Sequence, residues 1–490
     1  MVSEPAPGFV LALDQGGHAS RAVAFDTRGR ELAAAHVPVA TSRDGTDVVE
    51  QDPVELVRSL QVAAQDACDA EATRTLPALS AGLATQRSTI VCWERSSGRA
   101  LTSAISWQDR RNAAWLEQLK TVATAIRETT GLVLSPHYGA SKLRWCLDNV
   151  PAVQRAARSN DLAAGPLASF LLSRLLEEKP VMADPANASR TLLFDPELLD
   201  WSQSLLDVFG VDRGQLPRCV PTRHQYGHLP AGRRRIALVA CTGDQSAAAF
   251  AYGPPRESLA LVNVGTGAFV QRVAPAGVRL PDGLLLSVLR SDASGALRSH
   301  EGTVNGAGSA IDWLAGRVAI DVERALPTLA RPSAADPPLF MNGVGGLGAP
   351  YWKPDFPVEF IGGGDDLQLL AAVLESVVFL LSVNLEVMRG VAALDRIVIS
   401  GGLARCDYLC QTLADANGLV VERYALPEAT ARGIAFLAAG EPADWLVPDI
   451  ERSFAPATNP ALAARYVRWR SEMAHRGAVA LSRQAVGGRR

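Results

Sequence analysis

Short apolar runs that end in glycine-rich turns dominate the hydrophobic pattern of the chain. Phe9 to Leu13 is an apolar run that ends at Asp14, and a second run, Ala22 to Phe25, follows a turn of small residues. Runs of this length predict buried strands, and glycines between them predict a tight turn. Ser258 to Val262 and Phe269 to Val273 flank a similar turn near the middle of the chain. Two such units, one early in each half, indicate a duplicated architecture.

Helical patterns occur between and after these strand units. Asp52 is a suitable N-cap and Pro53 suits the first helical position, so we predict a helix that begins there. Leu370 to Met388 carries one long apolar face, and Arg396 to Ser400 is a strand before a glycine pair. Alternating strands and helices in both halves predict an α/β fold. A single core rarely exceeds about 300 residues, so we expect two domains.

Composition narrows the class of protein. The chain has 490 residues and a net charge of -3 without a long charged run, which argues against nucleic acid or an anionic membrane as a partner. The seven cysteines are scattered, so they do not form a disulfide framework, and Cys406 and Cys410 are interpreted as buried thiols. The N-terminus does not resemble a secretory signal, and Leu367 to Val383 contains Glu375 and Ser376, which favours a buried helix over a membrane span. We therefore expect a cytoplasmic protein.

Four glycine-containing turns follow strand-like runs and are candidates for phosphate binding: Asp14 to Ser20, Gly243 to Ser246, Gly265 to Gly267, and Gly401-Gly402. Glycine lets backbone N–H groups approach an anion, although each segment taken alone is also explained as a plain turn. The chain has no GxxxxGK[ST] motif, so it is not a P-loop enzyme. A GxGxxG match at Gly343 is followed by Pro350 rather than by a helix, which argues against a dinucleotide fingerprint.

Two aspartates beside these turns are candidates for chemistry. Asp14 ends a strand, where its carboxylate suits a Mg²⁺ ion held directly or through water, or simply a turn. Asp244 begins an apparent helix, where it is either an N-cap or a general base that accepts a hydroxyl proton.

At these residues the chain resembles the FGGY family of carbohydrate kinases, and its glycerol kinase branch in particular. The resemblance extends in register over nearly the whole chain. The matching segments are LALDQGGHASRAVAFD, VEQDP, ATQRSTIVCWE, SWQDRR, TGLVLSPHYGASKLRWCLDNVP, NASRTLLFDPELLDW, TGDQSAAAF, NVGTGAF, EGTVNGAGSAIDWL, GLGAPYW and SGGLARCDYLCQ. One such motif is weak, but their number and order make the resemblance specific.

The resemblance implies an α/β protein with two actin-like (ribonuclease H-like) ATPase domains and an interdomain cleft. Residues 1–250 form the N-terminal domain on the substrate side, and residues 251–490 form the C-terminal domain on the nucleotide side. The implied activity is ATP-dependent phosphorylation, with Mg²⁺, of a hydroxyl of a small polyol or sugar. Members often form homodimers or homotetramers, so either state is left open.

The resemblance also implies roles for individual residues. Asp244 matches the catalytic base and also contacts the substrate, and Asp14 matches the Mg²⁺-linked aspartate. The implied acceptor-binding residues are Arg87, Ser88, Trp107, His137, Gln245 and Phe269. The implied ATP-binding residues are Asp14, Gly16, Gly17, His18, Ser20, Arg21, Gly265, Thr266, Gly267, Gly308, Gly401 and Gly402. Trp107 and Phe269 would pack on the carbon skeleton of the acceptor, or else in the core.

Several positions depart from the family pattern. Gly17 and His18 replace two threonines of the first phosphate loop, and the imidazole of His18 either contacts a phosphate or turns to solvent. Ser88 replaces a glutamate, and His137 replaces a tyrosine, at positions that bind glycerol in the branch. Because a site that hydrogen-bonds hydroxyls discriminates through those groups, we expect that glycerol is not the substrate. The alternatives are a non-catalytic sugar- or nucleotide-binding regulator and an actin-fold ATPase that acts on proteins.

Overall fold

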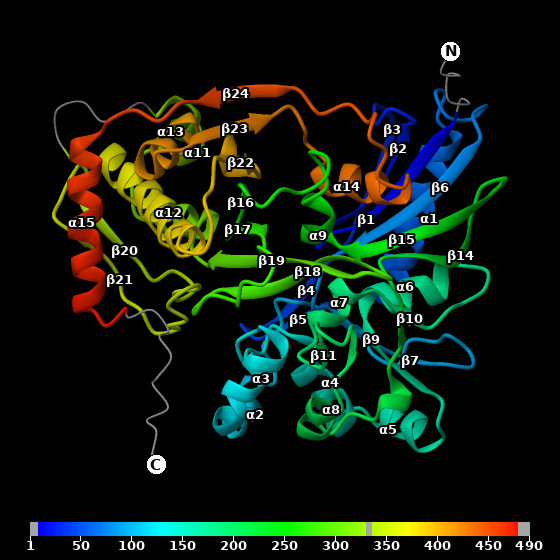
Figure 1. Ribbon diagram of the computed structural model, residues 1–490. Helices are drawn as coiled ribbons and strands as arrows, with labels where there is room; N and C mark the ends of the chain where they lie inside the picture. Colours follow the sequence, from blue (N-terminus) through cyan, green and yellow to red (C-terminus); the bar gives the residue numbers. More distant parts are fainter. Residues whose placement is uncertain (1–7, 330–335, 479–490) are drawn as a thin grey trace. The chain divides into compact units, whose positions relative to one another are not determined.

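The computed structural model describes residues 8–329 and 336–478 of the chain (Figure 1). These residues divide into two compact units. The first unit contains residues up to 255 together with 287–298 and 427–447, and the second contains 256–286, 299–426 and the residues from 448 onward. Two segments from the C-terminal half of the sequence thus belong to the first unit. The assignment of one half to the substrate and the other to the nucleotide stays a prediction.

The helices of the described residues are α1 (Pro53–Asp69), α2 (Ala113–Leu116), α3 (Ala123–Thr130), α4 (Gly139–Asn149), α5 (Pro151–Arg158), α6 (Leu167–Leu175), α7 (Pro185–Ser189), α8 (Gln203–Phe209), α9 (Asp244–Ala248), α10 (Gly308–Ala315), α11 (Val322–Ala325), α12 (Asp366–Arg389), α13 (Asp407–Asn417), α14 (Ala429–Ala438) and α15 (Pro460–His475).

The strands are β1 (Phe9–Gln15), β2 (Ala19–Asp26), β3 (Glu31–Pro38), β4 (Ser42–Asp44), β5 (Val48–Gln51), β6 (Ala78–Thr85), β7 (Ile90–Glu94), β8 (Ala104–Ile105), β9 (Leu162–Pro166), β10 (Met182–Ala183), β11 (Phe194–Asp195), β12 (Asp200–Trp201), β13 (Arg218–Cys219), β14 (Arg223–Ala231), β15 (Arg234–Gly243), β16 (Leu259–Val264), β17 (Ala268–Val273), β18 (Leu285–Asp292), β19 (Gly295–Val304), β20 (Leu339–Asn342), β21 (Val358–Ile361), β22 (Arg396–Ser400), β23 (Val420–Tyr424) and β24 (Ile450–Phe454).

The first unit is built around a six-stranded sheet with the order β14-β15-β6-β1-β2-β3. Successive side chains of a strand point to opposite faces, so each strand serves two layers. Leu11 and Leu13 of β1 belong to the same apolar cluster as Leu56 of α1. On the other face, Gly82 of β6 lies so close to Ile434 of α14 that an added Cβ would be 2.8 Å from that side chain. Helices therefore cover both faces of this sheet.

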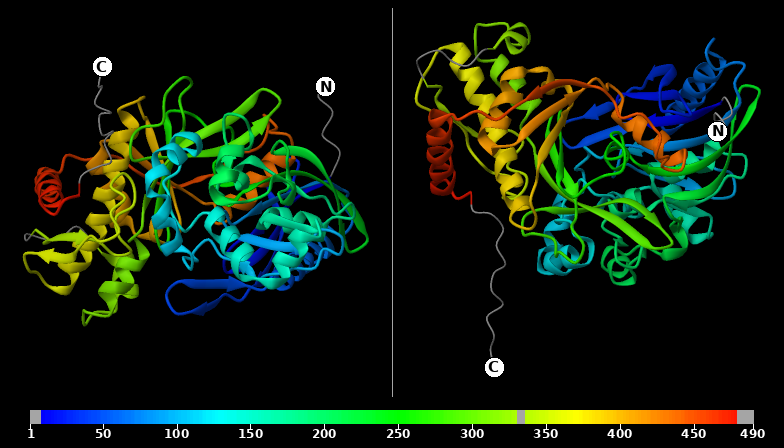
Figure 2. Two further views of the ribbon diagram at one scale, coloured as in Figure 1. Left: turned by 90° about the horizontal axis from the view of Figure 1, so that it is seen from below. Right: turned by 45° about the horizontal axis from the view of Figure 1, so that its top comes forward.

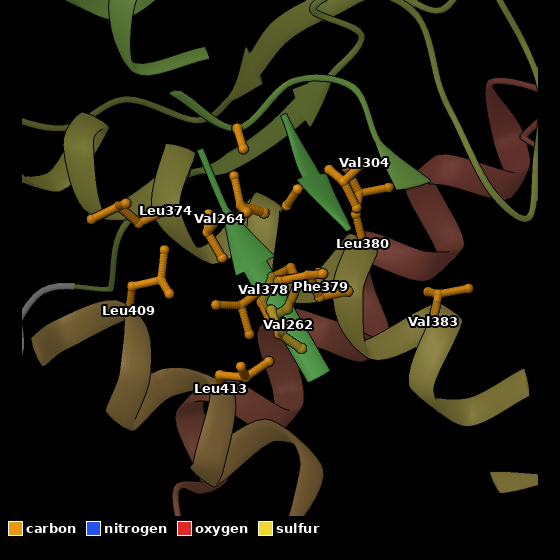
Figure 3. Packing of buried hydrophobic residues seen from close by; sticks show 14 of the residues in the cluster. Val262, Val264, Val304, Leu374, Val378, Phe379, Leu380, Val383, Leu409 and Leu413 are labelled. Carbon is orange, nitrogen blue, oxygen red and sulfur yellow. The ribbon is translucent and has the colours of Figure 1, made fainter. Parts of the chain in front are cut away.

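The second unit contains the seven-stranded sheet β18-β19-β17-β16-β22-β23-β24. Figure 3 shows Val262 and Val264 of β16 among apolar residues of α12 and α13, which pack in the core of this unit. The C-terminal helix α15 lies beside α12 in both views of Figure 2, and its Trp469 ring is 5.4 Å from the ring of Phe379 on α12. The Trp469 indole also donates to the Phe340 carbonyl at 3.1 Å.

Most local predictions from the sequence are confirmed. Asp52 caps α1 through a 2.8 Å bond from the Val54 N–H, with Pro53 at the first helical position. α12 is long and apolar enough to cross a membrane, but 89% of its most apolar window is buried inside the structure, as a core helix would be. The segment from Pro327 to Pro338 is rich in proline and alanine, which predicts a surface loop, and it lies partly outside the described residues, because 330–335 are not among them.

The GxGxxG match lies in a loop, and the Cys406–Cys410 pair lies in the core. Gly343 to Gly348 forms a loop after β20, and the next element is the strand β21, so no helix follows the GxGxxG match. Cys406 and Cys410 are buried free thiols. In the described part of the chain, no group of three or more His, Cys, Asp or Glu side chains is arranged to hold a metal ion.

Candidate functional site

Three neighbouring strands of the first unit end at one edge of their sheet. β1 pairs with β6 and β6 pairs with β15, both in parallel. Gln15, Thr85 and Gly243 stand at the same level of the register at the carboxyl ends of these strands. In open α/β sheets, ligands bind beyond the carboxyl ends of parallel strands. The predicted residues that follow or end these strands are therefore brought to one place.

Asp14 lies next to a network of ionic contacts at this edge. It stands opposite Arg21 in the antiparallel pairing of β1 with β2, and Arg21 Nη1 is 3.4 Å from Asp14 Oδ2. Arg21 Nε is also 3.4 Å from the Glu428 carboxylate, which precedes α14. The sequence missed Glu428, because 407 positions separate it from Arg21 and no local pattern relates the two residues.

The Asp14 carboxyl is suited to a cation. Burial, followed by the nearby charge of Asp244, raises its pKa from the ordinary value to about 7. A divalent cation would favour the ionised form and offset this burial. A single carboxylate would leave most of the coordination of such an ion to water and phosphate oxygens, which is the preference of Mg²⁺. The residues present thus fit a Mg²⁺ ion that arrives with a nucleotide.

The turn that joins β1 to β2 is short. Gly16 to His18 forms the turn, and the Gly16 N–H donates to the Ala19 carbonyl at 3.0 Å. His18 is exposed, and its carbonyl accepts the Val39 N–H at 3.0 Å. Whether its imidazole meets a phosphate stays a prediction.

Ser20 does not face this turn. Its hydroxyl is fully buried, donates to Gln15 Oε1 at 2.7 Å and lies 2.6 Å from the Ser59 hydroxyl on α1. The reason is the period of the strand, because Ser20 lies on the same face of β2 as Ala22 and Ala24, which pack in the core. The Ser20 hydroxyl therefore has a structural role in the described residues, and a contact of Ser20 with ATP stays a prediction.

Asp244, Gln245 and Arg87 form a cluster at the ends of β15 and β6. Arg87 Nε is 3.7 Å from Asp244 Oδ1, and an Arg87 guanidinium N–H donates to Gln245 Oε1. The same Asp244 oxygen accepts the Gln245 N–H at 2.7 Å. Gly243 is needed here, because a Cβ at this position would be 2.5 Å from Arg87 Cδ. The Asp244 side chain remains 32% exposed, so it is accessible to a substrate.

A serine and a second arginine that the sequence did not indicate complete this cluster. Arg87 Nη1 donates to Ser287 Oγ at 3.4 Å, and Arg190 donates to the same hydroxyl. Both arginines are buried. Arg190 lies in one of the segments that resemble the family, and this resemblance could have indicated a role for it. Ser287 is 200 positions from Arg87 in the sequence and lies in no such segment.

A buried lysine contacts two of the remaining residues that were predicted to bind the acceptor. Lys142 on α4 donates to the Ser88 carbonyl at 3.0 Å and to the His137 carbonyl at 2.8 Å. Ser88 has a φ of 65°, a conformation that is uncommon outside glycine. His137 Nδ1 lies 3.1 Å from the Trp107 carbonyl, which can only accept, so Nδ1 carries the hydrogen. Trp107 is 39% exposed, which argues against a core role.

In the second unit the predicted glycines meet at the ends of β16 and β22, which pair in parallel. Gly265 to Gly267 forms the turn between β16 and β17, and the Gly308 N–H at the start of α10 donates to the Gly265 carbonyl at 2.9 Å. Gly401 lies against β16, where a Cβ would be 2.5 Å from the Val264 carbonyl oxygen. Turns with close backbone approach and a helix start are suited to phosphate groups.

Two further positions of the second unit bear on the predictions. Phe269 lies on β17 next to the turn and is partly exposed. Asp407, where the family has an asparagine, contacts Arg423 Nη1 at 3.0 Å and also pairs with Arg452. The two arginines explain how a carboxylate is accommodated at this position.

Comparison with known proteins agrees with this geometry. The N-terminal domain of the FGGY family of carbohydrate kinases matches residues 9–251, and the C-terminal domain matches residues 260–440. A glycerol kinase of Geobacter sp. (strain M21) is 35% identical over 448 residues, covering 88% of this chain and 89% of the relative. A glycerol kinase of Bordetella parapertussis is 35% identical over 488 residues, covering 94% and 96%.

Solved structures show the same fold. The Plasmodium falciparum glycerol kinase with ADP has a TM-score of 0.87 at 21% identity and covers 98% of this chain and 100% of that one. A xylulose kinase from Rhodospirillum rubrum has a TM-score of 0.83 at 19% identity and covers 95% and 98%. The fold is therefore that of a two-domain, actin-like (ribonuclease H-like) kinase, as predicted. The chain belongs to the FGGY family of carbohydrate kinases, and members of that family are ATP-dependent phosphotransferases.

Proposed function

We propose that the chain transfers the γ-phosphoryl group of Mg²⁺-ATP to a hydroxyl of a small polyol or sugar other than glycerol. The observation that carries the proposal is the contact of Arg87 with both Asp244 and Gln245 at the edge of the first sheet. A carboxylate that is partly exposed and held next to an arginine is suited to accept a hydroxyl proton. An acceptor of this size is supported by the similarity to relatives named glycerol kinase, and a xylulose kinase has the same fold.

In the proposed reaction, Asp244 takes the proton of the acceptor hydroxyl while the oxygen forms a bond to the γ-phosphorus. The bond between that phosphorus and its bridging oxygen breaks, and ADP leaves. Asp14 would hold Mg²⁺ directly or through water, and the ion would supply neutralisation of the charge on the phosphates. Arg21 would contribute a further phosphate contact in the first unit, and the main-chain groups of Gly265 to Gly267 and of Gly401 are candidates for phosphate contacts in the second unit.

Specificity is the finer part of the proposal. Ser88 is a small neutral residue where the glycerol kinase branch has a glutamate, so the carboxylate is absent from this position and room is left for a larger acceptor. His137 donates its Nδ1 hydrogen to the Trp107 carbonyl, so a neutral ring presents Nε2 only as an acceptor. A tyrosine can donate at the same position. We infer an acceptor that is longer than glycerol and that donates a hydroxyl hydrogen to His137.

The test measures ADP release from Mg²⁺-ATP with glycerol, tetritols, pentitols and ketopentoses. Turnover should be higher with a longer acceptor than with glycerol, and Asp244→Asn should lower kcat by about 10²- to 10⁴-fold. Asp66→Asn changes the same functional group on the exposed face of α1 and should leave kcat unchanged. A preference for glycerol would refute the specificity, and an active Asp244→Asn variant would refute the role of the base.

A further inference from the structure

The segment VEQDP, residues 49–53, lies on and directly after β5, and its three polar side chains make contacts in different directions. Glu50 pairs with Arg111 at 2.6 Å, and Asp52 caps α1. Gln51 stands between them, is only 3% exposed, and points away from both contacts toward the turn after β1. A buried amide must satisfy its donors and its acceptor, so its partners are informative.

The orientation of the Gln51 amide is fixed by the groups that it contacts. Nε2 donates to the Gly17 carbonyl at 2.9 Å and to Thr41 Oγ1 at 3.2 Å. The carbonyl can only accept, and the Thr41 hydroxyl already donates to that same carbonyl at 3.1 Å. Both partners therefore require the NH₂ group of Gln51 on this side, and its Oε1 must face the other way.

The Gln86 side chain contacts the oxygen of the Gln51 amide. Gln86 Nε2 donates to Gln51 Oε1 at 2.6 Å, and the Gln86 N–H donates to the Gln15 carbonyl at 2.8 Å. Gln86 directly precedes Arg87 and Ser88. The two amides thus connect the Gly17 turn to the loop that begins at the end of β6.

We propose that Gln51 is a positioning residue that holds the Gly17 turn in register with the Arg87–Ser88 loop. The inference rests on the proposed function, in which the turn meets the phosphates of ATP and the loop meets the acceptor. Gln51 touches neither substrate in this proposal, and it acts through the Gly17 carbonyl and through Gln86. Because a misplacement of about 1 Å can cost about 100-fold in rate, two hydrogen bonds that fix one carbonyl are sufficient to matter.

The test replaces Gln51 with a group of nearly the same shape that lacks the donor. In Gln51→Glu, a carboxylate oxygen faces the Gly17 carbonyl without a hydrogen, whereas the other oxygen still accepts from Gln86. We expect the KM for ATP to rise at least tenfold, with a threefold or smaller change in kcat at saturating ATP. Asp52→Asn is the matched control, because asparagine also caps helices and Gln51 itself is unchanged. This control should leave the KM for ATP unchanged.

Binding and stability measurements separate this inference from the proposed function. Calorimetry with Mg²⁺-ADP requires no turnover, and Gln51→Glu should weaken that affinity tenfold even if no acceptor in the panel is phosphorylated. Thr41→Val removes the other donor to the Gly17 carbonyl and should weaken ADP binding in the same direction by about threefold. It serves in place of Gln51→Glu if that variant does not fold. ADP affinities within twofold of wild type in the folded variants would overturn the proposal.

Discussion

The two units contain comparable hairpins whose turns are held in different ways. β1 and β2 flank Gly16 to His18 in the first unit, and β16 and β17 flank Gly265 to Gly267 in the second. In the first turn, the Gly17 carbonyl accepts from the side chains of Gln51 and Thr41. In the second, the carbonyls of Gly265 and Thr266 accept main-chain N–H groups of residues 307–309.

The two turns also differ in the space around some of their glycines. An added Cβ at Gly267 would be 3.0 Å from the Val304 carbonyl oxygen, and one at Gly308, which contacts the same turn, would be 2.8 Å from the Gly265 carbonyl oxygen. A Cβ at Gly17 would meet no atom closer than 3.7 Å. A side chain is therefore accommodated more easily at Gly17 than at these two glycines.

The largest loss of stability is expected for a substitution of Gly401, which packs on the second turn. Its φ of 94° and ψ of 171° are adopted essentially only by glycine, and its added Cβ would be 2.5 Å from the Val264 carbonyl oxygen. Gly401→Ala should therefore lower the free energy of unfolding by about 2–5 kcal/mol. Urea denaturation measures this loss, and calorimetry measures the weaker binding of Mg²⁺-ADP that should accompany it.

The adjacent glycine provides the control for this prediction. An added Cβ at Gly402 has no atom within 4 Å, and its φ is not in the left-handed range. Gly402→Ala should change the free energy of unfolding by less than about 1 kcal/mol. Equal losses in the two alanine variants would show that the close packing on β16 does not constrain this turn.

A smaller effect is expected on the acceptor side, where a buried side chain holds the loops. Burial lowers the pKa of Lys142 to about 7, so the folded protein binds fewer protons than the unfolded chain between about pH 7 and the ordinary lysine value. Stability should accordingly rise with pH in this window, by up to about 1.4 kcal/mol per pH unit. Groups that face Lys142 include Asp109, which raises its pKa, and Arg111, which lowers it.

The measurement compares urea denaturation of wild type and Lys142→Met at pH values from 7 to 9. Methionine keeps much of the side-chain volume but does not titrate, so the difference between the two slopes isolates Lys142. Parallel slopes would mean that Lys142 is charged in the folded protein throughout this range. Lys142→Met should also raise the KM for the acceptor, because the Ser88 and His137 carbonyls lose their donor.

Much of the fold was predictable because its signals are local. The N-cap at Asp52, the apolar face of α12 and the strand at Arg396 to Ser400 each follow from a few adjacent residues, and β22 has those same bounds. The burial of the Ser20 side chain also follows from a local signal, because alternation along β2 places it on the face of Ala22 and Ala24.

The rest of the site depends on contacts that the sequence pattern does not encode. Glu428 reaches Arg21 and Ser287 reaches Arg87 only because distant segments join the first unit. The contacts of Lys142 have no signal in the sequence, since its two acceptors are main-chain carbonyls and carry no side-chain signature. Residues that act through the backbone are the ones that sequence reasoning finds least easily.

The smallest expected effect is a gain in stability at Gly17, which would sharpen the comparison of the two turns. The buried Gln86 Oε1 has no hydrogen-bond partner among the described residues, and it lies 3.7 Å from the Cβ position of Gly17. In Gly17→Ser, the hydroxyl is within reach of that oxygen, and the bond should stabilise the protein by about 0.5–1.5 kcal/mol relative to Gly17→Ala. Urea denaturation of both variants, repeated with Gln86→Leu, measures the bond directly. The gain in stability should disappear when Gln86 is replaced by leucine. If the Gly17→Ser variant is no more stable than the Gly17→Ala variant, the Gln86 oxygen is satisfied by water.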